Sequence, residues 1–526
     1  MARRAADLLV DCLAAHGIDR VFCVPGESYL AVLDALHDSN AIQTIVCRHE
    51  GGAGFMAVGD AKVTARPGVV FVSRGPGATN ASIAVHIAEQ DAVPMVLFIG
   101  QVPRAEIGRK SFHAADYGKM FSDMAKGVHV IHDAARIPEV VARAFKEAQT
   151  PTPGPVVVVL PEDMLEDETN TPVIGPVASP RTAPASAEVI ASLANVIAKA
   201  KRPLLMAGGM QLGTPGGRRA LLAASEAHHL PVVLTFKRQD YFPNTHPHYA
   251  GHLGFKIPKA AVDRYAEADL VIAVGTRLTE ATTQGYTLPE APVPRQLLIH
   301  IHDDPSQIGR NYHTEIAVVA DPPSVLRALA ETRTEAPPER AAWIRKLNDP
   351  VVAAMAWKAP ADGLLDMGAI VAALSKHAAK DAILGMDAGT FSGWLHRHFP
   401  FSIEHLMVGA VGGAMGIGMP AAVAAALRYP GRQVIHFLGD GGALMTGSEL
   451  ATAVQYGAKV KTFISNNNSY GTIRMHQEAA YKGRVHGTEL KNPDFAKWAE
   501  SFGAKGLRRR TRLPRRWPTM APSSST

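Results

Sequence analysis

The chain has 526 residues, of which 47% are hydrophobic and 19% are charged. This composition is typical of a folded protein and excludes an intrinsically disordered chain, and the length predicts roughly three domains of ~150 residues each. The net charge of +6 equals the six arginines between Arg508 and Arg516, so the rest of the chain is neutral. We therefore expect no nucleic-acid partner.

Cysteine usage and the apolar segments indicate where the protein works. Cys12, Cys23 and Cys47 are odd in number and confined to the N-terminal part, which predicts free thiols in a reducing, cytoplasmic setting. No apolar signal segment is visible in residues 1–16. Residues 406–427 carry no charge and are long enough to cross a bilayer. Their five glycines and Pro420 predict weak insertion, so we expect no membrane span.

Apolar runs rich in Val and Ile alternate with helical patterns, which predicts an α/β fold of three doubly wound parallel-sheet domains. Two proline-containing segments, 165–187 and 331–364, are predicted linkers. They divide the chain into 1–165, 188–330 and 365–507, followed by a basic tail, 508–526. The clearest predicted strands are 68–73, 155–161, 202–209, 269–275, 296–301, 381–387, 433–439 and 460–465.

The strand at 433–439 runs into a glycine-rich turn that contains Asp440, and a helix is predicted over Met445–Tyr456. Glycines permit close backbone approach, and a helix N-terminus offers unpaired N–H groups to an anion. Asp440 is therefore placed to hold a hard cation, such as Mg²⁺, beside a phosphate. The glycines of this turn are Gly439, Gly441 and Gly442.

The next predicted strand, 460–465, leads into three asparagines. Parallel strands end at the same edge of a sheet, so Asn467 can supply an amide oxygen to the ion held by Asp440. Alternatively, Asp440 caps a helix and the asparagines form a turn. Asp440 by itself, or the asparagines by themselves, would favour that alternative, whereas the two together at this spacing favour the metal site.

A GDG sequence followed about two dozen residues later by NN resembles the diphosphate and metal motif of thiamine-diphosphate-dependent enzymes. Further segments resemble the acetolactate synthase group, and the resemblance extends to about residue 507. It implies a pyrimidine-binding domain, a middle domain and a diphosphate-binding domain in the three ranges given above. The segments are 21–36, 47–81, 94–104, 153–164, 300–311 and 413–426.

The resemblance assigns roles to individual residues. Asp440, Asn467 and the carbonyl of Ser469 match the Mg²⁺ ligands, and Glu50 matches the glutamate that protonates N1′ of the cofactor pyrimidine. Met415 matches the apolar residue over which the cofactor bends. Without the resemblance, Glu50 would be an acid on a solvated helix face and Met415 plain core filling. Further cofactor contacts are assigned to Pro25, Gly26, Gly389, Thr390, Gly439, Gly441, Gly442, Tyr470 and Gly471.

Two loops depart from the synthase pattern. The synthases commonly have Phe-Gln where this chain has Phe112 and His113, and Gln-His-Gln where it has Thr390, Phe391 and Ser392. Both loops handle substrate and cofactor, so the substrate stays open. We count Phe112 and His113 as catalytic candidates with Glu50; His113 is either a proton carrier or an ordinary loop histidine.

FAD binding is also left open. Arg277 and Asp304 match the synthases' flavin-binding segments, but the acids between them are lost in 275–285 and 300–304.

The resemblance implies a cytoplasmic enzyme of branched-chain amino acid biosynthesis. It would decarboxylate a 2-oxo acid such as pyruvate and join the product to a second carbonyl. It also implies a homodimer or homotetramer in which Glu50 of one subunit meets the diphosphate site of its neighbour. The alternatives are a flavin-free relative that uses another 2-oxo acid or a diketone, and an inactive homologue.

The tail from Arg508 has no acid and no helical or alternating apolar period. We interpret it as the product of a shifted reading frame, which predicts that the third domain lacks a core element. The alternative is a natural disordered basic tail.

Overall fold

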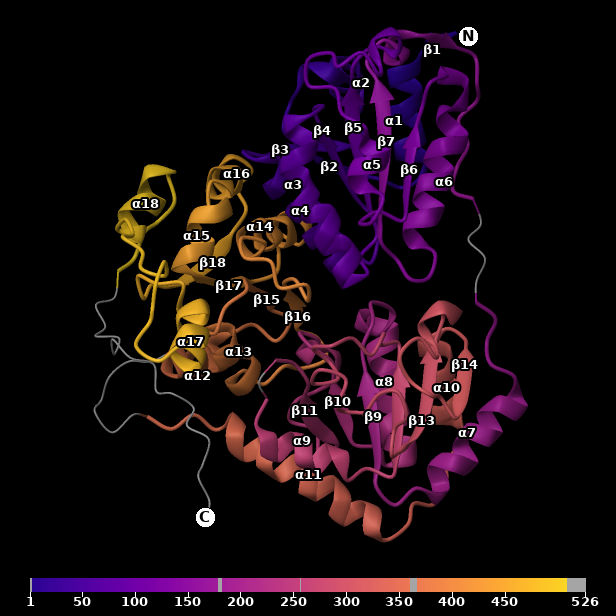
Figure 1. Cartoon of the computed structure of the whole chain (residues 1–526), viewed down its shortest axis with the longest axis vertical. Coiled ribbons are helices and arrows are strands. Elements are labelled where there is room, and N and C mark those ends of the chain that lie inside the picture. The colour runs from indigo at the N-terminus through magenta and orange to yellow at the C-terminus, as the bar shows by residue number, and fades with distance from the viewer. Residues whose placement is uncertain (1, 178–181, 256, 360–366, 509–526) are drawn as a thin grey trace.

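The computed structural model describes residues 2–177, 182–255, 257–359 and 367–508. Three α/β domains make up the chain, and Figure 1 shows them as an upper, a lower right and a left-hand lobe. Every predicted strand segment overlaps an observed strand, and the strands of all three main sheets pair in parallel. The predicted fold class is therefore confirmed.

The N-terminal domain is a six-stranded parallel sheet covered by helices on both faces. The sheet order is β3 (Gln43–Val46), β2 (Arg20–Cys23), β4 (Gly68–Val72), β5 (Met95–Gln101), β7 (Pro155–Pro161), β6 (Gly127–Val130). The helices are α1 (Ala5–Ala15), α2 (Leu30–Asp38), α3 (Glu50–Thr64), α4 (Pro76–Asp91), α5 (Tyr117–Phe121) and α6 (Ile137–Gln149). A short antiparallel pair, β1 (Arg3–Arg4) with β8 (Glu168–Thr169), ties the start of the chain to the domain's end.

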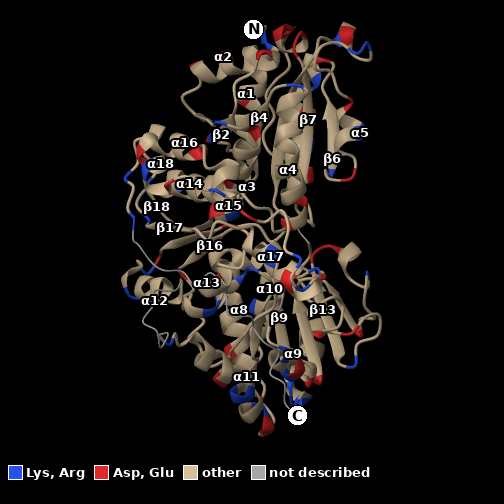
Figure 2. Cartoon of the chain, turned by 60° about the vertical axis from the view of Figure 1, so that its left-hand side comes forward, with Lys and Arg blue, Asp and Glu red and all other residues tan. Residues whose placement is uncertain are grey.

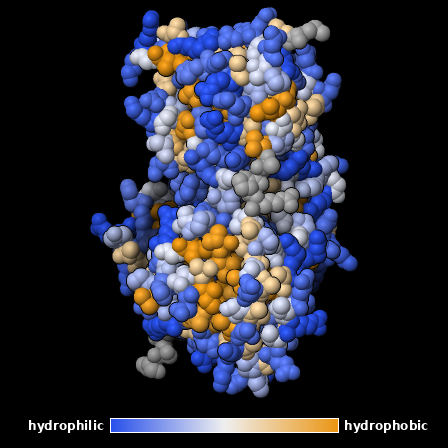
Figure 3. All heavy atoms as spheres, turned by 90° about the vertical axis from the view of Figure 1, so that its right-hand side faces the viewer, coloured by the Kyte–Doolittle hydropathy of each residue, from blue (hydrophilic) through white to orange (hydrophobic). Residues whose placement is uncertain are grey.

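The middle domain repeats this architecture. Its sheet order is β11 (Tyr249–His252), β10 (Val232–Leu234), β9 (Pro203–Ala207), β12 (Leu270–Val274), β13 (Leu297–His302), β14 (Ile316–Val319). Its helices include α7 (Ala187–Lys199), α8 (Pro215–His228), α9 (Lys259–Ala266) and α10 (Pro322–Glu331). Figure 3 shows hydrophobic side chains gathered on this domain's half of the right-hand face. Val189 of α7 and Val319 of the edge strand β14 are exposed.

The segment 331–364 is not the plain linker that its composition predicted. It contains α11 (Glu339–Met355), which packs along β11 of the middle domain. The buried Arg340 side chain donates hydrogen bonds to the carbonyls of Ile197 and His228, and Trp343 donates to that of Pro203. These long-range contacts explain why charge and proline content misled the prediction.

The third domain has a sheet of four strands among the described residues: β16 (Leu406–Val408), β15 (Ile383–Met386), β17 (Val434–Gly439) and β18 (Val460–Ser465), in that order. There, β18 pairs only with β17, and its side chains are half exposed. The tail from residue 509 lies outside the described residues, so the reading-frame interpretation stays a prediction. The helices are α12 (Met367–His377), α13 (Ser392–His398), α14 (Gly418–Arg428), α15 (Asp440–Thr446), α16 (Glu449–Gln455), α17 (Gly471–Ala480) and α18 (Phe495–Ser501).

The helix predicted over Met445–Tyr456 was wrong in its start and its continuity. The structure begins α15 at Asp440, directly after the strand, and ends it at Thr446 before α16 starts. At Gly447 an added Cβ would lie 2.0 Å from the carbonyl oxygen of Ala443 and 2.6 Å from the ring of Trp498. This close packing lies at the break between the two helices.

Small residues bring the first and third domains together around α3. A Cβ on Gly59 would lie 2.6 Å from Ala421 Cα on α14, and one on Gly54 would lie 2.4 Å from Ala84 Cβ on α4. Helices approach this closely only where side chains are absent or short. As a result, α3 is held between α4 of its own domain and α14 of the third domain.

Surface charge is mixed. Figure 2 shows basic and acidic residues interspersed over the three domains. The three cysteines are buried and free. Within the described residues, no helix meets the length and hydropathy needed to cross a membrane, and the uncharged stretch 406–427 instead forms β16, a loop and α14.

Candidate active site

The predicted diphosphate half of the site lies where β17 and β18 end. These strands are parallel neighbours, with Gly439 paired to Ser465, so the Asp440 turn and the asparagine loop leave the same edge of the sheet. The backbone N–H of Ser469 donates to Asp440 Oδ2 at 3.3 Å. Burial raises the pKa of Asp440, whereas the hydrogen bonds that it accepts oppose that shift. The structure therefore brings Asp440 and the asparagine loop together as predicted.

The asparagines do form a turn, but Asp440 does not cap a helix. Asn466 Oδ1 accepts from the N–H of Asn468 at 3.2 Å, and Asn467 Oδ1 accepts from the N–H of Ser469 at 3.1 Å. The residue before α15 is Gly439, and no side chain caps this helix. Turn formation and oxygen presentation are thus two functions of the same loop.

A contact that the sequence did not reveal comes from residues 488–492. The side-chain amide of Asn492 donates to Asp440 Oδ2 at 2.7 Å and to Asn466 Oδ1 at 2.9 Å. Three buried polar atoms at this place have no hydrogen-bond partner among the described residues: Ser469 Oγ, Thr488 Oγ1 and Asn492 Oδ1. Asn492 follows no periodic pattern and precedes a proline, so the only sequence signal was its place in a segment that resembles the family.

The oxygens here suit a hard divalent cation. A carboxylate, an amide oxygen and a backbone carbonyl are the ligand types that Mg²⁺ accepts alongside phosphate oxygens and water. The unpaired hydroxyl and amide oxygens nearby fit a hydrated ion as well. The residues present therefore fit a Mg²⁺-diphosphate group.

Met415 lies against the Asp440 turn. A Cβ on Gly441 would stand 3.1 Å from Met415 Cε and 2.6 Å from the ring of Tyr470. The N–H of Gly416 donates to both carboxylate oxygens of Asp387 at 2.9 Å. Asp387 is fully buried, which raises its pKa to about 6. This carboxyl group, which the sequence analysis did not single out, anchors the loop that carries Met415.

Gly389 and Thr390 follow β15 on the same side of the site. The N–H of Thr390 donates to the Thr472 hydroxyl at 3.2 Å, next to Gly471 at the start of α17. A Cβ added to Gly389 would lie 2.5 Å from the ring of Phe391, and a Cβ added to Gly439 would lie 2.9 Å from the same ring. The predicted contact residues of this half thus lie close together beside the Asp440 turn.

Glu50 is the first residue of α3. Asn80 Nδ2 donates to Glu50 Oε2 at 2.9 Å, and a Cβ on Gly77 would lie 3.5 Å from Glu50 Oε1. The backbone N–H groups of Arg48 and His49 donate to the buried carboxylate of Glu449 from the third domain, at 3.0 and 3.1 Å. Contacts with the third domain therefore hold the N-terminal end of α3, where Glu50 lies, in place.

The other predicted residues of this half border the start of α4. A Cβ on Gly26, next to Pro25, would overlap Ser73 at 2.5 Å, and one on Gly75 would lie 2.7 Å from the carbonyl oxygen of His113. The ring of Phe112, which is 72% exposed, stacks on that of His113 with 3.6 Å between centroids. His113 is exposed and has a positive φ of 64°.

The domains that carry the two predicted halves pack together within the chain through α3 and α14. No hydrogen bond between described residues links Glu50 or His113 to Asp440, Asn467 or Met415. Apolar side chains are exposed beside both halves: Leu444 and Met445 of α15, each 48% exposed, Ile473 of α17, 53% exposed, and Ile83 of α4, 40% exposed.

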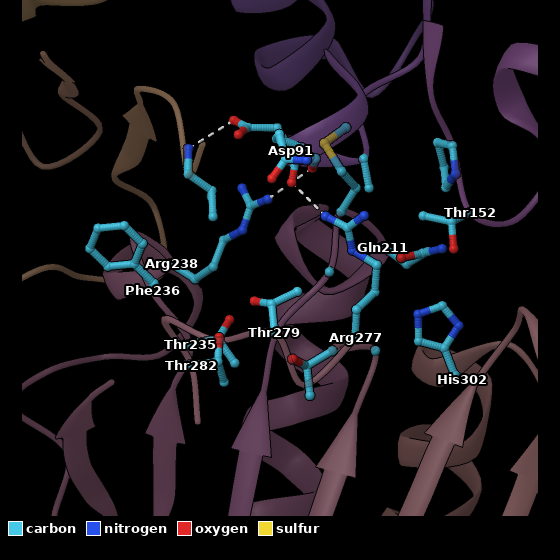
Figure 4. Close-up of a pocket in the computed structure, with 18 residues that line it drawn as sticks. Asp91, Thr152, Gln211, Thr235, Phe236, Arg238, Arg277, Thr279, Thr282 and His302 are labelled. Atoms are coloured by element: carbon cyan, nitrogen blue, oxygen red, sulfur yellow. Dashed lines mark hydrogen bonds between the residues drawn. The ribbon is translucent and has the colours of Figure 1, made fainter. Parts of the chain in front are cut away.

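A separate small cleft lies at the carboxyl ends of the middle sheet, where strand order reverses between β9 and β12. Figure 4 shows Arg238 and Arg277 reaching from this sheet toward Asp91 of the first domain. Arg277 donates to the carbonyl of Gln90, and the Asp304 carboxylate accepts from the N–H and hydroxyl of Thr152. Both residues matched to the flavin segments are therefore engaged with the protein itself.

Comparisons with known proteins cover almost the whole chain. The family models for the thiamine pyrophosphate enzymes match over the N-terminal TPP binding domain at residues 3–120, the central domain at 190–329 and the C-terminal TPP binding domain at 387–516. The acetolactate synthase large subunit of Parasynechococcus marenigrum is 33% identical over 522 residues, covering 96% of this chain and 83% of that protein. That of Lactococcus lactis is 31% identical, covering 96% and 88%. The mitochondrial catalytic subunit of the same enzyme from Saccharomyces cerevisiae is 32% identical, covering 95% and 76%.

Proposed function

The chain belongs to the thiamine pyrophosphate enzymes, in the acetolactate synthase group, and on that premise we propose that it decarboxylates pyruvate and joins the product to a second carbonyl. The observation that carries the proposal is the meeting of Asp440 with the asparagine loop at one sheet edge, close to Met415. Retention of Glu50 at the start of α3 supports an active enzyme over an inactive homologue.

The residues of the chain divide the work. Thiamine diphosphate, when bound, supplies the carbanion chemistry, and the protein supplies geometry and proton control. Asp440, Asn467 and the Ser469 carbonyl would hold Mg²⁺ against the diphosphate. Met415 would support the cofactor over the Asp440 turn, and the Glu50 carboxyl group would hold the proton at N1′ of its pyrimidine.

Product analysis tests this function directly. The purified protein is incubated with pyruvate, thiamine diphosphate and Mg²⁺, and carbon dioxide and acetolactate are measured. Omission of thiamine diphosphate or Mg²⁺ serves as the control and should abolish both products. Release of carbon dioxide without a carbon–carbon product would favour a decarboxylase. Turnover only of another 2-oxo acid or a diketone would favour the relative indicated by Thr390, Phe391 and Ser392.

Mg²⁺ binding is proposed at Asp440. Asp440→Ala removes the only charged group of the ligand set, so the diphosphate would be poorly neutralised and cofactor affinity should collapse while the fold is retained. Calorimetric titration of thiamine diphosphate at fixed Mg²⁺ measures this loss, and circular dichroism reports the fold. An unchanged titration would contradict the site.

We further propose that the complete site forms between two subunits. Support comes from the exposed side chains of Phe112, Leu444 and Ile473 beside the two predicted halves. Among the described residues, moreover, no hydrogen bond joins Glu50 to Asp440 or Asn467. Mixing Glu50→Gln with Asp440→Ala tests the arrangement, because each mixed dimer would contain one intact site. Random exchange should then restore about a quarter of the wild-type activity. Activity that stays absent after demonstrated subunit exchange would place both halves in one chain.

FAD is not needed for the proposed reaction, and it stays an open prediction. The engagement of Arg277 and Asp304 with the protein argues against their use by a flavin. The visible absorption spectrum of the purified protein, before and after incubation with FAD, tests this. A cytoplasmic location also remains a proposal, supported by the three free cysteines.

A further inference from the structure

The segment Thr488–Asn492, here called the strap, runs beside the asparagine loop. The N–H of Tyr470 donates to the Thr488 carbonyl at 2.9 Å, and the N–H of Leu490 donates to the Asn468 carbonyl at 2.9 Å. Ser469 and Glu489 form an antiparallel bridge between these two bonds. Backbone pairing therefore fixes the strap against the loop that supplies two of the proposed metal ligands.

The strap delivers one side chain to the metal ligand Asp440. Asn492 Nδ2 lies 2.7 Å from Asp440 Oδ2, 2.9 Å from Asn466 Oδ1 and 3.3 Å from Asn468 Oδ1. All three neighbours are oxygen acceptors, so the amide nitrogen, not the amide oxygen, must point at them. The orientation of the Asn492 amide is thus determined by its surroundings.

This contact has a consequence for the carboxylate. The hydrogen bonds from Asn492 and from the Ser469 N–H both end on Asp440 Oδ2, and neither uses Oδ1. Two donors on Oδ2 restrain the orientation of the carboxylate, so that Oδ1 can be directed at an ion. Metal-binding carboxylates are commonly held by such outer hydrogen bonds.

The oxygen of the same amide is buried and has no partner among the described residues, as are the hydroxyls of Ser469 and Thr488. Unpaired buried oxygens are costly, and a group that served only to hold the loop would not need them. Their clustering at the strap points to a polar ligand shell at this place.

We propose that Asn492 is a positioning residue for the metal site: it orients Asp440 so that Oδ1 faces the ion, and its own oxygen faces the ion's hydration shell. This inference rests on the proposed use of Mg²⁺ and thiamine diphosphate. It concerns a residue that supports a ligand and does not itself bind the metal.

The test measures cofactor binding, not turnover. Thiamine diphosphate is titrated calorimetrically into cofactor-free protein over a series of Mg²⁺ concentrations for the wild type, Asn492→Leu and Lys491→Ala. Leucine keeps the volume but removes the donor, and Lys491 is an exposed neighbour on the strap. We expect Asn492→Leu to need about 10–100-fold more Mg²⁺ for half-maximal binding, with full binding recovered at high Mg²⁺. Lys491→Ala should match the wild type.

The outcomes separate the possibilities. A purely structural role would reduce the bound fraction at every Mg²⁺ concentration, and equal Mg²⁺ dependence of Asn492→Leu and the wild type would likewise overturn the proposal. Should Asn492→Leu not fold, Asn492→Ala is measured in the same way and must show the same shift. A wild type that binds no thiamine diphosphate at any Mg²⁺ concentration would refute the proposed function, and the role of Asn492 would fall with it.

Discussion

Replacing Gly442 by alanine should lower both the stability of the third domain and its affinity for thiamine diphosphate. A Cβ at this position would lie 2.1 Å from Asp387 Oδ2, and ordinary contacts begin at 3.4 Å, so one of the two groups must move by more than 1 Å. Asp387 cannot easily yield, because it is fully buried and accepts hydrogen bonds from the N–H groups of Gly416 and Ala388. The Asp440 turn would therefore have to shift.

The magnitude follows from the overlap. Adding a methyl group to a closely packed interior costs about 1–3 kcal/mol, and each kcal/mol lowers Tm by about 2–4 °C in a domain of roughly 150 residues. We expect Tm to fall by about 2–12 °C, with weaker calorimetric binding of thiamine diphosphate. The matched control is Gly393→Ala in α13, where a Cβ meets no atom within 4 Å, so stability should be unchanged or slightly raised. Equal Tm and equal cofactor affinity in Gly442→Ala and the wild type would refute the reasoning.

Three further outcomes are expected. Glu50→Gln should fold and bind the cofactor but slow proton exchange at its C2 atom by about 10²–10⁴; a near wild-type rate by NMR would contradict the assignment. Asp91→Ala removes the ion-pair partner of the buried Lys62 ammonium and should lower the free energy of unfolding, measured by chemical denaturation, by about 3–5 kcal/mol. The additional substitution Lys62→Met should restore part of this loss. Burial lowers the pKa of Lys237 from 10.5 to about 8. Above pH 10.5 the lysine is neutral in both the folded and the unfolded state and costs no stability. As the pH falls from 10.5 to about 8, only the unfolded state gains the proton, so the folded protein loses stability. Lys237→Met should flatten the pH dependence by about 3 kcal/mol across this window, and parallel curves for variant and wild type would rule this out.

The sequence was sufficient where the signal was local or followed from a general rule of chain geometry. Apolar runs of strand length located the principal strands, and the rule that parallel strands end at one sheet edge placed Asp440 beside the asparagine loop before any coordinates. The local pattern was insufficient for the helix after Asp440, because the break before α16 lies among close contacts of Gly447 with Trp498, and no local pattern reveals such contacts.

Only the tertiary structure showed which side chains hold the Asp440 turn and the start of α3 in place. Asn492 lies 52 positions from Asp440 in the chain, and Glu449 reaches the start of α3 from 400 positions away, so nothing in either local sequence indicates the partner. Gly442 illustrates the difference. The sequence determined that a glycine stands in the turn and suggested room for a diphosphate, whereas the structure showed that the Asp387 carboxylate occupies the place of its missing side chain. Strand ends follow from short-range periodicity, but which side chains meet there depends on how separate segments pack together.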